Sequence, residues 1–247
     1  MIPKIIHYCW LSNDPIPEEL QFYIQTWKKY FSDYEFVKWD FTRFNKSDRI
    51  WVSQAFDNKK YAFAADYIRL YAIYHYGGIY LDSDVEVLNS FNDYLNLKTM
   101  IGWQYNHRGL EVAVFGAEKG QEWVGKCLDY YKDRPFIKAD GQFDMFTLPL
   151  LVENVLKDNG YKFITVDNID SAYHVSNAKC IPVFEPDFFS PKSFDGRLHI
   201  SGNTVSIHHF VASWTSPMHR FLRKLAIKIG GYRLKNFLSF VKKKICN

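Results

Sequence analysis

Two aspartates two positions apart are the residues of this chain best suited to chemistry. They end the segment Gly77–Asp84 (GGIYLDSD), where an apolar run stops at two glycines and a short predicted strand follows. In an extended segment successive side chains alternate between faces, so we expect Asp82 and Asp84 to point the same way while Leu81 and Val85 point into a sheet. Two adjacent carboxylates suit Mg²⁺ or Mn²⁺, which complete their coordination with waters and substrate phosphates. The pattern predicts a divalent-cation site and a phosphate-bearing substrate; the alternative is a pair of solvated acids at a strand end.

A second pair of charged residues lies just upstream. The segment Tyr61–Tyr76 is apolar almost all round, which predicts a helix buried on most faces, and Asp66 and Arg69 share one of those faces. Burying such groups costs several kcal/mol unless they are paired or bind a ligand. One interpretation is a structural ion pair between them. In the other, Arg69 meets a phosphate or sugar oxygen and Asp66 accepts hydrogen bonds from sugar hydroxyls.

The elements that must position these residues alternate between strand and helix. The first three are a strand over Ile2–Leu11, a helix over Glu18–Tyr30 and a strand over Glu35–Trp39, a β-α-β start that implies a parallel sheet. Further strands are predicted over Met100–Trp103, Val112–Gly116, Phe163–Val166 and Val205–His209, and helices over Glu122–Tyr131 and Leu148–Leu156. The pattern predicts one α/β domain over residues 1–216.

The remaining residues, 217–247, form a basic tail. The chain of 247 residues has a net charge of +4, but the tail holds nine Lys and Arg and no acid, which leaves 22 basic and 27 acidic residues before it. Apolar residues recur at helical spacing between the cations, a pattern typical of an amphipathic helix on an anionic membrane surface. The alternative is a helix packed on its own domain. No nucleic-acid-binding motif is present, so nucleic acid is not expected as a partner.

Three features bear on location. No apolar run is long enough to span a bilayer, the first ten residues do not resemble a signal peptide, and the four cysteines are scattered without metal-binding or disulfide spacing. We therefore expect a cytoplasmic protein with reduced cysteines, held peripherally at the inner face of the cell membrane by its tail.

Three ordered motifs resemble one family. The run Ala65–Arg69 (ADYIR) with Gly77–Asp84 resembles the D-x-x-R and GG-x-Y-x-D-x-D signature of retaining glycosyltransferase family 32. That group includes initiating α-mannosyltransferases, capsular-polysaccharide transferases and, more distantly, clostridial glucosylating toxins. The segments Ile2–Trp10 (IPKIIHYCW) and Ile207–Trp214 (IHHFVASW) are similar to its first strand and closing motif. The resemblance implies a GT-A fold, a Rossmann-like mixed sheet flanked by helices, here with a basic C-terminal helical tail.

The resemblance also implies roles for individual residues. Asp82, Asp84 and His208 would hold Mn²⁺ or Mg²⁺, with Asp82 acting directly or through water and His209 as the alternative to His208. Catalytic roles would fall to Asp66, Arg69 and Asp84, and the substrate would be bound by Trp10, Asp66, Arg69, Asp82, Ser213 and Trp214, with Trp10 stacking on the nucleotide base. Two departures, Ala65 in place of the family's frequent Ser and Thr147-Leu148-Pro149 in place of its T-G-P element, affect the details of the donor and acceptor contacts around Asp144 and Thr147.

The expected reaction moves a hexosyl unit from a nucleotide sugar to a glycan or lipid-linked oligosaccharide, as in surface or capsular polysaccharide synthesis. A UDP-hexose is the first donor expected. A protein-glycosylating effector and a metal-dependent nucleotidyltransferase are the alternatives. A glycoside hydrolase is disfavoured because it needs two carboxylates across a sugar ring. A non-catalytic sugar-binding module would explain the aromatic residues without explaining the D-x-D pair. An EF-hand is excluded because Val87 and Asp93 stand where its loop needs Gly and Glu.

Overall fold

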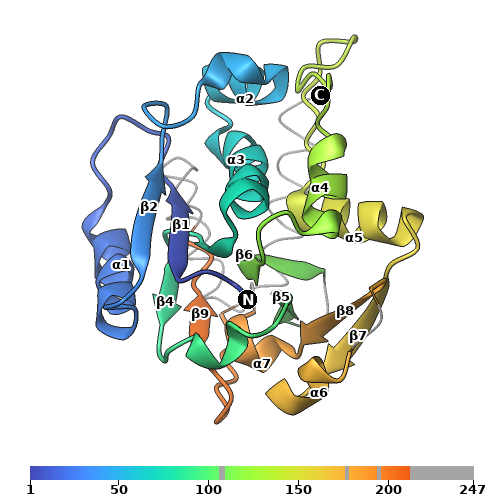
Figure 1. The fold of residues 1–247 in the computed structure, drawn as a ribbon. Coiled ribbons are helices and arrows are strands. Elements are labelled where there is room, and N and C mark those ends of the chain that lie inside the picture. The colour runs from blue at the N-terminus through green and yellow to red at the C-terminus, as the bar shows by residue number, and fades with distance from the viewer. Residues whose placement is uncertain (106–108, 176–177, 194–195, 212–247) are drawn as a thin grey trace, which may run out of the picture.

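The computed structural model describes residues 1–105, 109–175, 178–193 and 196–211. Its centre is a seven-stranded sheet in the order β2-β1-β3-β6-β5-β8-β7, and a second sheet pairs β4 with β9 (Figure 1). The tail over 217–247 and the predicted boundary at residue 216 lie outside the described residues. In the described part of the chain, no helix combines the length and the apolar character needed to cross a membrane.

The first half of the chain supplies three parallel strands of the large sheet. β1 (Ile5–Cys9), α1 (Glu18–Tyr30) and β2 (Glu35–Trp39) form the predicted β-α-β unit, with β1 and β2 parallel. The 3-10 turn η1 (Lys46–Asp48), α2 (Ile50–Asp57) and α3 (Tyr61–Tyr76) follow. β3 (Gly78–Leu81) then returns parallel to β1. Since β1, β2 and β3 run the same way, their carboxyl ends meet at one edge of the sheet.

The rest of the chain adds one antiparallel strand and three further parallel strands to the large sheet. β4 (Val85–Val87) and the 3-10 turn η2 (Asn92–Tyr94) lead to β5 (Thr99–Trp103) and β6 (Leu110–Ala117). β6 is antiparallel to both β3 and β5, which makes the sheet mixed. The remaining elements are α4 (Glu122–Asp129), α5 (Leu148–Asp158), β7 (Lys162–Val166), α6 (Ile169–Tyr173), β8 (Cys180–Phe184), α7 (Pro186–Phe189) and β9 (Ser206–His208). The predicted mixed α/β sheet flanked by helices is confirmed.

Two hydrophobic cores lie on opposite faces of the sheet. One packs Tyr80 of β3 with buried residues of α2, α3, α4 and α5, and the other packs the adjacent Ile79 and Leu81 with residues of α1, η2 and α7. This alternation follows from the two-residue period of a strand. It fixes β3 in the middle of the molecule, so the segment that follows Leu81 starts from a rigid position.

Two glycines let β3 start close to β1. Gly77 and Gly78 have φ values of 68° and 102°, which residues other than glycine rarely adopt. A Cβ atom on Gly78 would lie 2.7 Å from the carbonyl oxygen of Ile5 in β1. The two glycines therefore end α3 and allow the strand pairing that carries Asp82 to the edge of the sheet.

His7 in β1 ties these elements together. The side chain is 1% exposed; its Nε2 lies 2.8 Å from the carbonyl oxygen of Gly77, and the Trp39 indole N–H donates to Nδ1 at 3.1 Å. This arrangement requires a neutral ring with the proton on Nε2. Burial lowers the pKa of His7 to about 4, although the hydrogen bond to Gly77 opposes the shift.

His7 should make the fold sensitive to acid. Because the folded-state pKa of about 4 lies below the ordinary 6.5, the contribution is fully present above pH 6.5 and is lost as pH falls toward 4. We expect a loss of about 3 kcal/mol in the free energy of unfolding over that range. Urea unfolding of the wild type and His7→Gln from pH 7 to 4 measures it, because the variant does not titrate there. A difference between the two proteins that stays constant with pH would contradict the prediction.

Candidate active site

The two aspartates of the D-x-D pair lie on a turn between β3 and β4. β3 ends at Leu81, and the Val85 N–H donates to the Asp82 carbonyl at 3.0 Å, which closes the turn. The predicted extended path through Asp82 and Asp84 is therefore wrong, although the two carboxylates still lie close together, as expected. Asp and Ser favour turns because their side chains bond to nearby backbone. The chain turns here to leave the large sheet and start β4, which belongs to the second sheet.

A second strand brings a histidine to this turn. β9 pairs antiparallel with β4, and the register sets His208 opposite Val85. The His209 N–H donates to the Asp84 carbonyl at 3.0 Å, and the Val211 N–H donates to Asp84 Oδ2 at 2.8 Å. The end of the described chain is thus fastened to Asp84 by its backbone.

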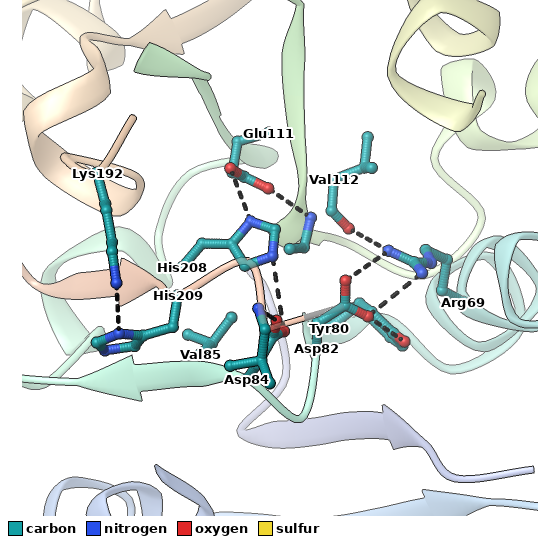
Figure 2. Close-up of polar contacts among 12 residues, drawn as sticks. Arg69, Tyr80, Asp82, Asp84, Val85, Glu111, Val112, Lys192, His208 and His209 are labelled. Atoms are coloured by element: carbon teal, nitrogen blue, oxygen red, sulfur yellow. Dashed lines mark hydrogen bonds and ion pairs between the residues drawn. The ribbon is translucent and has the colours of Figure 1, made fainter. Parts of the chain in front are cut away.

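Asp82, Asp84 and His208 form one cluster. One side-chain ligand atom from each lies within 4.8 Å of the others, and His208 Nε2 is 3.6 Å from Asp84 Oδ1 (Figure 2). The side chains of Asp84 and His208 are each 12% exposed, and that of Asp82 is 27% exposed. The cluster can therefore be reached from solvent, at the edge where the parallel strands end.

A fully buried carboxylate stands behind His208. Glu111 in β6 is 0% exposed, and its Oε2 lies 3.3 Å from His208 Nδ1. Burial alone lowers the pKa of His208, but Glu111 and then Asp84 raise it to about 9. Glu111 gave no signal in the sequence, since it is a single acid inside an apolar strand, 97 positions from its partner.

His209 points to a different set of residues. Its ring stacks on Tyr23 of α1 at 4.3 Å, Nε2 lies 2.8 Å from Glu86 Oε2, and Nδ1 lies 3.1 Å from Lys192 Nζ. In Figure 2 His208 lies between Glu111 and Asp84, whereas His209 points away toward Lys192. Of the two histidines, only His208 belongs to the cluster with the carboxylates.

Arg69 is paired with two aspartates. Its guanidinium lies 3.3 Å from both Asp66 and Asp82, donates to the Val112 carbonyl at 2.9 Å, and lies over the Tyr80 ring at 4.6 Å. The structural ion pair with Asp66 is thus present, and it extends to Asp82. The Tyr80 hydroxyl also donates to Asp82 Oδ1 at 2.9 Å, so Asp82 is held in place from two sides.

Asp66 is in an unusual electrostatic state. It is 8% exposed, and burial raises its pKa to about 7, against the opposing effect of Arg69. A carboxyl group with such a pKa exchanges between its charged and neutral forms near neutral pH. It can accept or donate a hydrogen bond to a hydroxyl group there.

Comparison with known proteins finds a family that resembles part of the chain. Residues 17–102 match the family described as glycosyltransferase sugar-binding region containing DXD motif. This part of the chain is therefore similar to the sugar-binding region of DXD glycosyltransferases. The matched residues include Asp66, Arg69, Asp82 and Asp84 but not Glu111 or His208.

Two curated relatives match part of this chain. Inositol phosphoceramide mannosyltransferase 3 of Schizosaccharomyces pombe is 32% identical over 127 residues, which cover 50% of this chain and 35% of the relative. Mannosyl phosphorylinositol ceramide synthase SUR1 of Saccharomyces cerevisiae is 36% identical over 88 residues, covering 34% and 23%. The chain thus spans about a quarter to a third of the length of these relatives.

A solved structure supports the fold. A glycosyltransferase involved in the glycosylation of the major capsid of PBCV-1 superposes with a TM-score of 0.50 at 11% identity, over 91% of this chain and 98% of the other. At that identity the likeness concerns the fold alone. With the mixed sheet described above, it confirms the predicted GT-A glycosyltransferase fold.

The remaining predicted site residues are only partly placed. Trp10 directly follows β1, at the same edge of the sheet as Asp82, and its indole N–H donates to the Asp14 carbonyl at 2.8 Å. Thr147 precedes α5 without a side-chain capping bond, and Asp144 pairs with Arg134 at 3.2 Å. Ser213 and Trp214 lie outside the described residues.

Proposed function

We propose that this protein is a metal-dependent retaining glycosyltransferase that moves a hexosyl unit from a nucleotide sugar to a glycan or lipid-linked acceptor. The observation that carries the proposal is the cluster of Asp82, Asp84 and His208 at the carboxyl edge of the parallel strands. Ligands of open α/β sheets bind at that edge. The glycosyltransferase region over residues 17–102 supports the same reaction class.

The cluster suits a divalent cation. Its donors are two carboxylates and one imidazole, a mixed set in which Mn²⁺ is accommodated better than the strongly oxygen-preferring Mg²⁺. Asp82 already accepts from Tyr80 and Arg69, but an ionised carboxylate has further lone pairs for a direct or water-mediated contact. When bound, the cation would neutralise the charge that develops on the leaving diphosphate.

The residues around the cluster prepare the site before substrate arrives. Although burial alone lowers the pKa of Arg69, Asp82 raises it well above its usual value, so the guanidinium stays charged. Arg69 thereby orients the carboxylates of Asp66 and Asp82. Asp66 then offers hydrogen bonds to donor-sugar hydroxyls, and Trp10 offers an aromatic face to the nucleotide base at the same edge. Fixed groups of this kind act through electrostatic preorganisation.

We expect retention at the anomeric carbon by substitution on the face of the leaving group, without an enzyme nucleophile. UDP-galactose, UDP-glucose and UDP-N-acetylhexosamines are the first donors to test. The names of the two relatives refer to mannosyl transfer, which supports including GDP-mannose among the donors to test.

The acceptor proposal is a lipid-linked glycan at an anionic membrane surface. The ceramide in the relatives' names supports a lipid-bearing acceptor, and the basic residues over 217–247 would bring the enzyme to that surface. Sedimentation with anionic vesicles tests this: the full chain should sediment more strongly than a chain ending at residue 216. Equal vesicle binding by the full chain and the shortened chain would show that residues 217–247 do not attach the protein to the membrane.

The experiment that tests the proposed reaction is a donor panel. The purified chain is incubated with Mn²⁺ and each nucleotide sugar, and released UDP or GDP is measured. Slow release from one donor that stops on chelation supports the transferase. Release of pyrophosphate from a nucleoside triphosphate would instead indicate a nucleotidyltransferase, and no release from any donor would count against both.

A further inference from the structure

Glu111 is a buried acid that the reaction outlined above does not use. It lies in the middle of the molecule on β6, 0% exposed, between two buried neighbours, Leu110 and Val112. A carboxylate in such a place is strongly unfavourable unless its oxygens are satisfied. Its partners should therefore reveal why it is there.

Both oxygens of Glu111 have a partner. Oε1 accepts from the Ala113 N–H at 2.8 Å, two residues along the same strand, which fixes the carboxylate plane. Oε2 lies 3.3 Å from Nδ1 of His208. The contact with Ala113 holds the carboxylate of Glu111 in a fixed position on the sheet. The contact with His208 can therefore fix the orientation of the imidazole ring.

The two ring nitrogens of His208 face different acidic residues. Nδ1 faces Glu111, while Nε2 faces Asp84 Oδ1 at 3.6 Å (Figure 2). The Phe210 ring lies 3.9 Å from the imidazole, on a residue whose φ of 53° is rare outside glycine. With Glu111 accepting from Nδ1–H, the nitrogen that faces the aspartates is Nε2, which offers a lone pair to a cation once it has released its proton.

We propose that Glu111 is a positioning residue that holds the Nδ1–H of His208 and thereby presents Nε2 as a metal ligand to the Asp82–Asp84 cluster. This inference rests on the proposed cation site. A carboxylate behind a ligating histidine sets the ring orientation and tautomer and increases the basicity of the ligating nitrogen. Glu111 and His208 are far apart in the sequence, and the contact exists because β6 pairs with β3 beside the cluster.

The test is Mn²⁺ affinity of the full chain without any sugar donor. Electron paramagnetic resonance of free Mn²⁺ gives the Kd for the wild type and for Glu111→Gln. Gln has one acceptor oxygen for two donors, so it cannot serve both Ala113 and His208. We expect the Kd to rise about 10- to 100-fold. An unchanged Kd would overturn the inference.

A double-mutant cycle separates positioning from general disruption. In a His208→Ala background, Glu111→Gln should change the Kd by less than about twofold, because its effect passes through His208. An equal loss in both backgrounds would overturn the inference. Glu86→Gln is the matched control, since Glu86 pairs with His209 at 2.8 Å outside the cluster, and it should leave the Kd unchanged.

A second measurement needs no substitution at Glu111. In ¹⁵N-histidine NMR of the Cd²⁺-saturated wild type, the signals of His208 are identified by their absence in His208→Ala. Nδ1 should carry the proton and Nε2 should be bound; the opposite arrangement would overturn the inference. If the wild type binds no Mn²⁺ at all, the proposed cation site itself is wrong, a result distinct from equal binding by wild type and Glu111→Gln.

Discussion

Replacing Asp84 by Asn is expected to reduce Mn²⁺-dependent release of nucleotide from the donor sugar by about 100- to 1,000-fold. Asp84 Oδ1 faces His208 Nε2, while Oδ2 accepts from the Val211 N–H. Asn keeps the volume and one acceptor for Val211, so the backbone contact can persist while the negative charge is lost. Nucleotide release at saturating donor and Mn²⁺ measures the effect.

The matched control for Asp84→Asn is Asp93→Asn. Asp93 lies exposed in η2, away from the cluster, and the same chemical change there should leave nucleotide release within about twofold of the wild type. Thermal unfolding of both variants should remain within a few degrees of the wild type. Undiminished release by Asp84→Asn would show that this carboxylate is not part of the reacting site.

Replacing Arg69 by Met is expected to lower the free energy of unfolding by about 3–5 kcal/mol. Met has similar length but no charge, so Asp66 and Asp82 would lie close together without their common cation, and Asp66 would have to take up a proton to stay buried. The Val112 carbonyl would lose a hydrogen-bond donor as well. Urea-induced unfolding at pH 7 measures the loss.

Arg134→Met is the control for this effect. Arg134 also pairs with an aspartate, Asp144 at 3.2 Å, but its side chain is 41% exposed. Water solvates such a pair, so we expect a loss below about 1 kcal/mol. Combining Arg69→Met with Asp66→Asn and Asp82→Asn should recover part of the stability, because no unpaired carboxylates remain. Equal losses for the two arginine variants would refute the explanation by burial.

The local elements could be predicted where one short-range pattern decides them. The helix over Tyr61–Tyr76 was predicted with the bounds that the structure has, because its apolar run is long and two glycines end it. β2 and the bounds of α1 were predicted equally well. Strand ends were less well predicted: the first strand covers Ile5–Cys9 and not Ile2–Leu11, since pairing with neighbours decides where a strand stops.

The extended path of the D-x-D segment was predicted wrongly because strand pairing, which decides where a strand stops, also decides this path. An extended path through Asp82 and Asp84 was expected, but β4 leaves β3 in order to pair with β9, more than a hundred positions later in the chain. A partner so distant leaves no periodic signal near Asp82. The turn-forming residues Asp, Ser and Asp were the available signal.

By itself, the sequence determined the α/β class, the buried helix with Asp66 and Arg69, and the presence of two carboxylates beside a strand that begins with glycine. These features depend on composition and on apolar side chains that recur every two to four residues along the chain. Only the tertiary structure decided that His208 and not His209 joins those carboxylates, that Arg69 pairs with Asp82, and that Glu111 lies behind His208. Each of these contacts joins separate elements of the fold, so it exists only once sheet packing has set the register of β3, β6 and β9.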